Sequence, residues 1–238
     1  MRKFGLGECV MKYAPIESLI VQPFSFEVRS GSGLRIYQRC LKRVMDVALV
    51  VVSLPVILPI IAMLALMIRR DGGPAFFVQP RVGLNGKVFP CFKLRTMHVD
   101  AEARLAEMCA ADPIMAAEWN RDQKLRIDPR ITRFGCFLRK TSLDELPQLF
   151  NVLRGEMSII GPRPFLPSQE ELYRRAGGRV YYAMRPGITG SWQVAGRGDT
   201  RFVDRVGFDD DYHSRLSFKE DLMILLKTIG VVIKSTGR

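Results

Sequence analysis

Two adjacent acids lie in the most strongly patterned stretch of this sequence. Asp144 and Glu145 occur in the run from Lys140 to Leu149, and arginines stand on both sides of them: Arg130, Arg133, Arg139, Arg154 and Arg163. Cationic side chains and Mg²⁺ neutralise phosphoryl oxygens in transfer reactions, and a carboxylate either holds the metal or attacks phosphorus. The segment therefore contains a nucleophile, a metal ligand and an anion-binding cluster, which together suit phosphate chemistry.

The same acids also fit a structural role at the start of a helix. Ser142 and Glu145 have the spacing of a capping box, and Asp144 would interact favourably with the positive end of the helix. Pro147 argues against this, because a helix that begins at Ser142 would place the proline beyond its first turn. Neighbouring side chains on a helix point about 100° apart, so one carboxylate can face a substrate while the other holds a metal. Both interpretations stay open at this stage.

Four cations stand in distinctive backbone settings. Arg163 lies between two prolines, which restrict the backbone around a guanidinium that must hold a fixed direction. Arg185 precedes a proline and two glycines that permit close backbone approach. Lys93 and Arg95 alternate along a predicted strand, for which a solvated strand edge is the alternative.

The overall composition restricts the class of partner. The chain has 238 residues, a hydrophobic fraction of 47% and a formal net charge of +12. These values support a folded domain with a real core, and the charge requires nucleic acid, an anionic membrane surface or a phosphorylated substrate as partner. Nucleic-acid-binding surfaces interleave basic residues with exposed aromatics, whereas the basic residues here stand beside acids in Gly/Pro motifs. We therefore expect no nucleic acid among the partners.

The cysteines and histidines restrict the kind of metal site. The five cysteines (Cys9, Cys40, Cys91, Cys109 and Cys136) contain no C-x-x-C pair, and the two histidines are far apart in sequence. This spacing argues against a structural zinc site and against a disulfide framework, and is typical of reduced thiols in a cytosolic setting. Any metal is therefore expected to have oxygen ligands.

An uncharged apolar segment extends over residues 47–68. Its length is about that of one helix crossing a hydrocarbon core, and a buried core helix is the soluble alternative. Pro55 and Pro59 predict a bend, with Ser53 as a candidate donor to the carbonyls that they free. Basic residues flank both ends, which a helix-break-helix satisfies by entering and leaving on the same cytoplasmic face. The sequence thus predicts a re-entrant membrane helix over residues 39–70.

The rest of the chain divides around this segment. Residues 1–38 mix Gly, Ser and Pro and are interpreted as a variable, mobile arm. Residues 71–238 are expected to form a compact cytosolic domain, with a strand hairpin turning at Asn85-Gly86 and a helical pair broken at Asp112-Pro113. Residues 218–234 predict an amphipathic helix that packs on the core or lies in the membrane interface. The expected fold class is α+β.

Six motifs, in chain order, resemble those of one protein family. They are Lys42-Arg43…Asp46, Gly73-Pro74-x-Phe76-Phe77-x-Gln79-x-Arg81-Val82-Gly83, Lys93-x-Arg95-Thr96-Met97, Thr141-Ser142-Leu143-Asp144-Glu145-Leu146-Pro147-Gln148-Leu149, Met157-Ser158-x-x-Gly161-Pro162-Arg163-Pro164 and Arg185-Pro186-Gly187-Ile188-Thr189-Gly190. On these residues the chain resembles the bacterial sugar transferase family, the monotopic polyprenyl-phosphate phosphoglycosyl transferases. It looks most like the exopolysaccharide galactose- or glucose-1-phosphate transferases. Members often place serine directly before the bending proline, whereas here Leu54 separates Ser53 from Pro55.

The resemblance implies a small monotopic membrane enzyme with a compact catalytic domain and interfacial amphipathic helices. Asp144 is expected to attack the sugar-proximal phosphorus of a UDP-hexose, release UMP and form a covalent aspartyl-phosphosugar. Polyprenyl (undecaprenyl) phosphate then accepts the sugar phosphate. Glu145 is the expected partner acid and Mg²⁺ ligand. The residues expected to contact substrate phosphates are Arg139, Arg163, Arg185, Lys93 and Arg95.

The resemblance also implies a cellular setting. The expected location is the bacterial inner membrane, with the catalytic domain facing the cytoplasm and contacting the inner leaflet. There the enzyme would perform the first membrane step of exopolysaccharide or capsule synthesis. Contact with downstream glycosyltransferases and formation of a homodimer stay open. Two other functions stay open: a non-catalytic basic scaffold anchored in the membrane, and a nucleotide-sugar hydrolase. Loss of function in Asp144→Asn separates the enzyme from the scaffold, and formation of a lipid product separates the transferase from the hydrolase.

Overall fold

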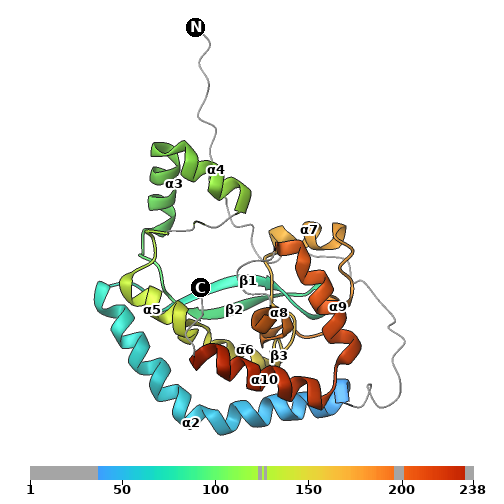
Figure 1. Cartoon of the computed structure of the whole chain (residues 1–238). Coiled ribbons are helices and arrows are strands. Elements are labelled where there is room, and N and C mark those ends of the chain that lie inside the picture. The colour runs from blue at the N-terminus through green and yellow to red at the C-terminus, as the bar shows by residue number, and fades with distance from the viewer. Residues whose placement is uncertain (1–36, 123–124, 126–127, 196–200, 234–238) are drawn as a thin grey trace.

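The computed structural model describes residues 37–122, 125, 128–195 and 201–233 (Figure 1). Apart from its last two residues, the predicted arm over residues 1–38 lies outside the described part of the chain. The described elements are a mixture of helices with two small sheets, which confirms the α+β expectation at that level. A long helix, α2 (Lys42–Ile68), runs along one edge of the molecule, with the other labelled elements on one side of it.

Helix α2 is continuous over 27 residues and follows a π-helical turn at Tyr37–Leu41. Its buried residues follow one narrow stripe, whereas Val52 and Leu66 on its other faces are 78% and 70% exposed. Among the described residues it is the only helix long and apolar enough to cross a membrane, and 17% of its most apolar window is buried. A core helix of a soluble protein would be mostly buried, so this exposure favours the membrane interpretation.

The two prolines bend α2 without interrupting it. Pro55 and Pro59 lie inside the helix, and its axis changes direction part-way along its length in Figure 1. The structure therefore has one bent helix where a helix, a break and a second helix were expected. The Ser53 hydroxyl donates to the Val50 carbonyl (2.9 Å), whereas Pro55 leaves the Val51 carbonyl without its usual donor. Serine hydroxyls bonded back to the preceding turn accompany helix bending, so Ser53 supports the bend at a neighbouring position.

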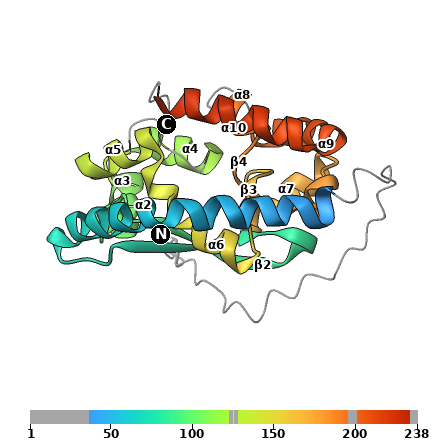
Figure 2. The same ribbon diagram turned by 90° about the horizontal axis from the view of Figure 1, so that it is seen from below.

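Two small sheets carry segments that lead to the acidic pair. Strands β1 (Phe76–Val82) and β2 (Val88–Leu94) pair antiparallel around the predicted turn, where Asn85 and Gly86 have φ of 57° and 75°. Strands β3 (Ser158–Ile160) and β4 (Gly187–Thr189) pair in parallel. In the view from below, α2 crosses the molecule with β2 and β3 on opposite sides of it (Figure 2).

The shorter helices surround these sheets. Helices α3 (Ala101–Ala111) and α4 (Pro113–Asp122) form the predicted hairpin and stand apart from the body, at the end away from α2 (Figure 1). Helices α5 (Arg133–Thr141) and α6 (Gln148–Arg154) flank the acidic pair. The later helices are α7 (Glu170–Arg175), α8 (Ser191–Ala195), α9 (Arg205–Arg215) and α10 (Phe218–Ile233).

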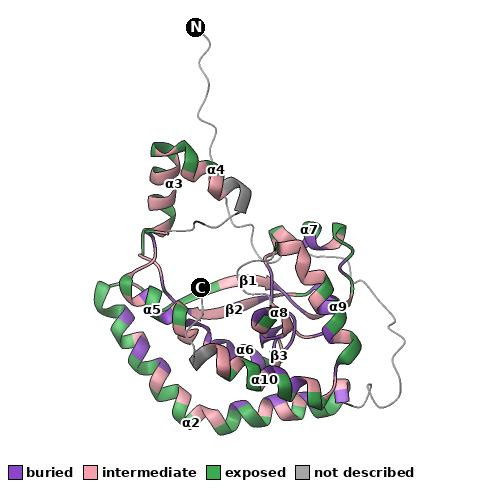
Figure 3. Cartoon of the chain, viewed as in Figure 1, coloured by how far each residue is buried: buried purple, intermediate pink, exposed green. Residues whose placement is uncertain are grey.

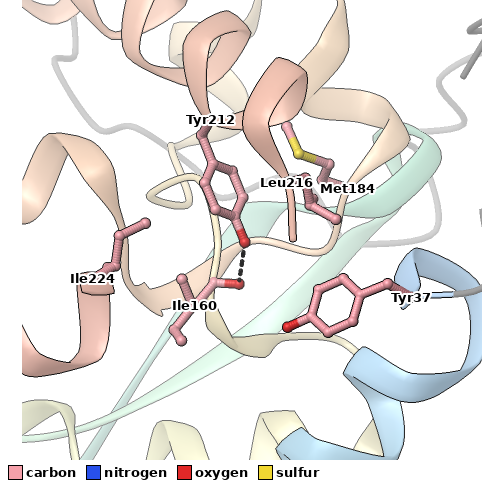
Figure 4. Close-up of a cluster of buried hydrophobic side chains, with 6 residues drawn as sticks. All are labelled: Tyr37, Ile160, Met184, Tyr212, Leu216 and Ile224. Atoms are coloured by element: carbon pink, nitrogen blue, oxygen red, sulfur yellow. Dashed lines mark hydrogen bonds between the residues drawn. The ribbon is translucent and has the colours of Figure 1, made fainter. Parts of the chain in front are cut away.

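The core lies along the inner side of α2 and between the two sheets, and its residues are among those coloured purple in Figure 3. One buried cluster joins the start of α2 to β3, α9 and α10 (Figure 4); its members are Tyr37, Ile160, Met184, Tyr212, Leu216 and Ile224. Helix α10 forms where a helix was predicted, and apolar side chains lie on two of its faces: Ile224 is buried, whereas Phe218, Leu222 and Leu226 are exposed on the opposite face. An exposed apolar stripe of this kind suits a membrane interface.

Candidate active site

The two acids lie on a tight turn between two short helices. Leu143–Glu145 form a single 3-10 turn after α5, and Pro147 directly precedes α6. Ser142 has a left-handed conformation, with φ of 58°, and ends α5; in this described segment its side chain makes no capping hydrogen bond. The helix-cap interpretation of Ser142 is therefore wrong. The turn instead leaves Asp144 and Glu145 buried side by side.

Glu145 is held by two cations that act on one oxygen. Lys93 Nζ lies 2.8 Å and Arg163 Nη2 lies 2.9 Å from Glu145 Oε1. Burial by itself raises the pKa of Glu145, but the charges and hydrogen bonds of Arg163 and Lys93 outweigh burial and lower the pKa well below the usual carboxyl range. Glu145 is therefore a fixed anion at neutral pH.

Asp144 differs from its neighbour because no described residue hydrogen-bonds its carboxylate. Burial raises the pKa of Asp144 above its usual value; the charge of Lys93 opposes this, the adjacent Glu145 adds to it, and Arg139 and Arg163 oppose it. The carboxylate thus lies among positive charges without being occupied by hydrogen-bond donors. Its lone pairs are available for a metal or for attack on an electrophile.

Arg139 reaches the acidic pair from α5. Its Nε donates to the Thr96 hydroxyl (2.9 Å), and burial lowers the pKa of Arg139 while the charge of Asp144 opposes that effect. Helix α5 can approach Thr96 because residue 135 is glycine: a Cβ on Gly135 would lie 1.9 Å from the Thr96 carbonyl oxygen. The guanidinium is thus fixed by a side chain that follows β2 and is drawn toward Asp144.

Arg95 has its hydrogen bonds away from the acids. It donates to both carboxylate oxygens of Asp71 and to three backbone carbonyls, over 2.6–3.2 Å; the carbonyls belong to Ile68, Pro74 and Met97. These contacts use the full donor capacity of a guanidinium. Arg95 therefore fastens the end of α2 to the end of β2.

Arg185 also has a structural contact. Its Nε donates to the carbonyl of Gly155 (2.9 Å), the left-handed residue that ends α6. Of the five cations predicted to contact phosphate, the structure brings Lys93, Arg139 and Arg163 to the acidic pair. It places Arg95 in contact with Asp71 and three backbone carbonyls, and Arg185 in contact with the Gly155 carbonyl.

Two arginines that were not among the predicted phosphate-binding residues extend the positive region around Arg163. Arg81 on β1 donates to the Pro164 carbonyl (3.2 Å), and the Arg205 guanidinium lies 4.3 Å from the centre of the Trp192 ring. Burial, together with the charge of Arg163, lowers the pKa of both arginines, and lowers that of Arg205 to about 10. An anion relieves the repulsion among partly buried guanidinium groups, so this cluster suits a substrate phosphate.

Asn151 is a further residue that the sequence analysis missed. It is fully buried on α6, where Oδ1 accepts from the Phe92 N–H (3.0 Å) and Nδ2 donates to the Pro90 carbonyl (2.6 Å). It thereby pairs with the edge of β2 and docks the turn of the two acids beside Lys93. Arg81 could have been found from its sequence setting, because it follows a proline as Arg163 does. Asn151 and Arg205 carry no such local signal.

The donor set at the acids can be compared with the needs of the expected Mg²⁺. Among the described residues, no group of three or more His, Cys, Asp or Glu side chains could hold a metal ion. Mg²⁺ at phosphate sites is usually held by one or two carboxylates, with substrate phosphates and waters completing its shell. Asp144 and the second oxygen of Glu145, which no described residue hydrogen-bonds, fit such a partial set.

Comparison with known proteins places the chain among bacterial sugar transferases. The model of the family described as "Bacterial sugar transferase" matches residues 37–235. Over 84% of its length, the chain is 49% identical to the "UDP-galactose-lipid carrier transferase" of Erwinia amylovora and 48% identical to the "Undecaprenyl-phosphate galactose phosphotransferase" of Salmonella typhimurium. Over 82% of its length, it is 43% identical to the "Exopolysaccharide production protein ExoY" of Sinorhizobium fredii.

The matched region is a different share of each relative. It spans 42% of the Erwinia and Salmonella proteins and 87% of the Sinorhizobium protein. In this chain the matched region contains α2, both sheets and all of the residues around Asp144 and Glu145. The chain belongs to the bacterial sugar transferase family.

Proposed function

We propose that this chain transfers a hexose-1-phosphate from a UDP-sugar to polyprenyl (undecaprenyl) phosphate. The observation that carries the proposal is the contrast between the two acids: Asp144 is buried with no hydrogen-bond donor among the described residues, whereas two cations hold Glu145 as an anion. Environments that separate two carboxyl groups in this way assign them different roles. Asp144 is the nucleophile, and Glu145 orients the cations and contributes to metal binding.

The reaction proceeds in two displacements at one phosphorus atom. A carboxylate oxygen of Asp144 attacks the sugar-proximal phosphorus, the bond to the bridging oxygen breaks, and UMP leaves with that oxygen. The sugar phosphate stays on Asp144 as an acyl phosphate. A phosphate oxygen of polyprenyl phosphate then attacks the same phosphorus, which restores the Asp144 carboxylate and yields the polyprenyl-diphospho-sugar.

The surrounding cations stabilise the charge that both displacements move. Lys93, Arg139 and Arg163 lie at the acids, and Arg81 and Arg205 continue the positive region beyond Arg163. Prearranged cations in a partly buried site act on phosphoryl oxygens without reorganising during the reaction. When bound, Mg²⁺ would be held by Asp144 or Glu145 together with the substrate diphosphate and would neutralise part of its charge.

The apolar surfaces support a lipid acceptor. Helix α2 exposes most of its apolar side chains, and α10 adds a second exposed apolar stripe. A site attached to a membrane helix can meet a soluble nucleotide sugar and a lipid phosphate at the surface of the bilayer. We place the chain at the bacterial inner membrane, entering and leaving through the cytoplasmic leaflet, with residues 71–238 on the cytoplasmic side.

The proposed sugar is galactose or glucose. Two of the relatives carry galactose in their names and the third is named for exopolysaccharide production. The proposed reaction would thus be the first membrane step in the synthesis of an exopolysaccharide or capsule.

The test is an intact-protein mass spectrum after detergent-purified protein is incubated with Mg²⁺ and either UDP-galactose or UDP-glucose, without lipid. The expected result is an added hexose-phosphate mass, together with one equivalent of UMP. The Asp144→Asn protein should show neither. Adding undecaprenyl phosphate should then remove the adduct and produce a lipid-linked diphospho-sugar.

Two controls separate the alternatives. Asp211→Asn removes an acid from an exposed ion pair on α9 and should leave the adduct unchanged. Free hexose phosphate without a lipid product, in the presence of undecaprenyl phosphate, would identify a hydrolase. The absence of both adduct and UMP with either sugar would contradict the proposed reaction.

A further inference from the structure

The two cations on Glu145 reach it from different sheets. Lys93 lies on β2, in the antiparallel sheet, and Arg163 follows β3, in the parallel sheet. Within the described chain, no strand of one sheet pairs with a strand of the other. The antiparallel sheet reaches the segment after Arg163 through β1. There Arg81 donates to the Pro164 carbonyl (3.2 Å) and the Val82 N–H donates to the Phe165 carbonyl (3.0 Å). Helix α2 makes a second connection, because it contacts both sides.

Helix α2 contacts the β3 side through a buried acid. Asp46 is 1% exposed and directly precedes the uncharged part of the helix; its Oδ2 accepts from the Ser158 hydroxyl (2.7 Å) and its Oδ1 from the Ile159 N–H (3.1 Å). Strand β4 pairs with the residues on either side of Ile159, so the Ile159 N–H points away from β4. Asp46 accepts the hydrogen bond of this N–H at the other edge of β3. A buried carboxylate in a membrane-associated helix is costly unless it is paired in this way, which indicates a specific role.

The path from β3 to Arg163 is stiff. The Gly161 N–H donates to the Thr189 carbonyl (2.9 Å), and the Gly187 N–H donates to the Pro162 carbonyl (2.8 Å). The two glycines approach so closely that a Cβ on Gly187 would lie 2.1 Å from the Gly161 nitrogen. In addition, Tyr212 donates to the carbonyl of the last β3 residue (3.4 Å), as Figure 4 shows. A displacement of β3 is therefore passed on to Arg163.

The other end of α2 contacts the Lys93 side. Arg95 donates to the carbonyl of Ile68, the last residue of α2, and to both oxygens of Asp71 just beyond it. Arg95 follows Lys93 by two positions, and its own N–H donates to the Ala75 carbonyl (2.8 Å). The end of α2 is thus joined to the stretch of chain that carries Lys93.

We propose that α2, together with the β1 contacts to Pro164 and Phe165, sets the relative position of Lys93 and Arg163. In this arrangement Asp46 is the positioning residue for Arg163, and the Arg95–Asp71 pair positions Lys93. The inference rests on the proposed function, because it concerns the same site. It gives Arg95 a role that needs no contact with substrate. If Asp46 and the Arg95–Asp71 pair only stabilised the fold, substitution of either acid would loosen β2 and β3 equally.

Hydrogen exchange of the full chain in phospholipid nanodiscs tests the inference directly. Asp46→Asn and Asp71→Asn each remove one charge while preserving shape and leaving Arg95 and both cations in place. We expect Asp46→Asn to speed exchange across residues 158–163 by about 10-fold and to leave residues 88–94 unchanged. Asp71→Asn should do the reverse. Equal acceleration of both segments, or of neither, would overturn the proposal.

A crossed mutant cycle gives a second readout, the affinity for UDP in MgCl₂ measured by calorimetry. Asp46→Asn should weaken binding about 10-fold in the native background and in Lys93→Ala, but less than about 2-fold in Arg163→Ala, where the side chain that it positions is gone. Asp71→Asn should show the opposite dependence, with its effect lost in Lys93→Ala. Additive effects in every background would contradict a positioning role.

The control is Asp211→Asn, whose ion pair with Arg215 is exposed on α9 and touches neither strand. It should change neither the exchange pattern nor the affinity. If the native protein binds no UDP, the proposed function fails. The exchange pattern then still decides whether α2 positions the two strands.

Discussion

Lys93 and Arg163 donate to the same oxygen of Glu145, from 2.8 Å and 2.9 Å, although one lies on β2 and the other follows β3. Each cation alone would neutralise the carboxylate, so the pair leaves the site with surplus positive charge. In the proposed reaction, the phosphates of the substrate would neutralise this surplus. The fold therefore holds these cations at positions where their mutual repulsion is lower with a bound phosphate than without one.

Removal of one of these cations should affect activity much more than stability. In Lys93→Met, Arg163 still neutralises Glu145, and repulsion among the cations decreases. We expect the free energy of unfolding in detergent to change by less than about 1 kcal/mol, while kcat/KM falls by about 100-fold or more. Chemical denaturation and UMP-release kinetics measure the two quantities. A loss of several kcal/mol with unchanged kcat/KM would reverse this assignment.

A matched pair of glycine substitutions tests the contact between α5 and the end of β2. In Gly135→Ala the new Cβ would overlap the Thr96 carbonyl, so α5 must shift and we expect a loss of more than about 2 kcal/mol in stability. A Cβ on Gly207, in α9, would meet no neighbouring atom within 4 Å, so Gly207→Ala should stabilise the protein by about 0.5–1 kcal/mol. Thermal unfolding compares them. Similar shifts in Tm for both would contradict the close approach at Thr96.

The buried acid Asp209 should make stability depend on pH. Burial raises its pKa to about 7, against the attraction of Arg205 and a hydrogen bond from Tyr173. The folded state then binds the proton more tightly than the unfolded state. The stability contribution is complete below the unfolded pKa and is lost as pH rises from about 4 to 7, by at most about 4 kcal/mol.

Asp209→Asn supplies the comparison for this pH effect. It keeps an acceptor for Tyr173 and cannot titrate, so its unfolding free energy should fall less than that of the native protein over the same pH range. Denaturation at a series of pH values measures the difference. Parallel profiles for the two proteins would exclude Asp209 as the source.

The exposed face of α2 should be required for membrane retention. Val52 is 78% exposed on α2, and Ile114 is 80% exposed on α4, at the end of the molecule away from α2. Val52→Asp places a charge in the hydrocarbon region at a cost of about 3 kcal/mol, so less protein should sediment with membranes. Ile114→Asp is the matched control and should sediment like the native protein. Equal losses for both would argue against α2 as the membrane-facing element.

Much of the local structure could be predicted because the signals are local. Asn85-Gly86 requires the positive φ values that make a tight hairpin turn, and Pro113 can only begin a helix after the break. The acidic pair stood out because its residue types and its neighbours are close in sequence. The same reasoning failed at Ser142, where the pattern of a helix start is also compatible with a left-handed helix end.

The partners of the arginines could not be predicted in the same way. Arg95, Arg163 and Arg185 all stand in restricted motifs, yet only Arg163 contacts the acidic pair directly. A guanidinium reaches far, and its partners depend on which distant segment packs beside it. Bends in helices are similarly ambiguous, since the prolines of α2 predict a change of direction but not whether the helix continues through it.

The ion pair between the start of α2 and α10 has a consequence for synthesis. Lys42 lies 2.5 Å from Asp221, which also accepts from Tyr37, and 179 positions separate Lys42 from Asp221. At about 5–20 residues per second, translation of that interval takes roughly 10–35 s. During this time α2 is available for membrane insertion while its first lysine has no counter-charge from α10. A nascent chain that stalls before Asp221 would keep Lys42 without this partner. The order of translation therefore makes the contact with α10 one of the last contacts that α2 can form.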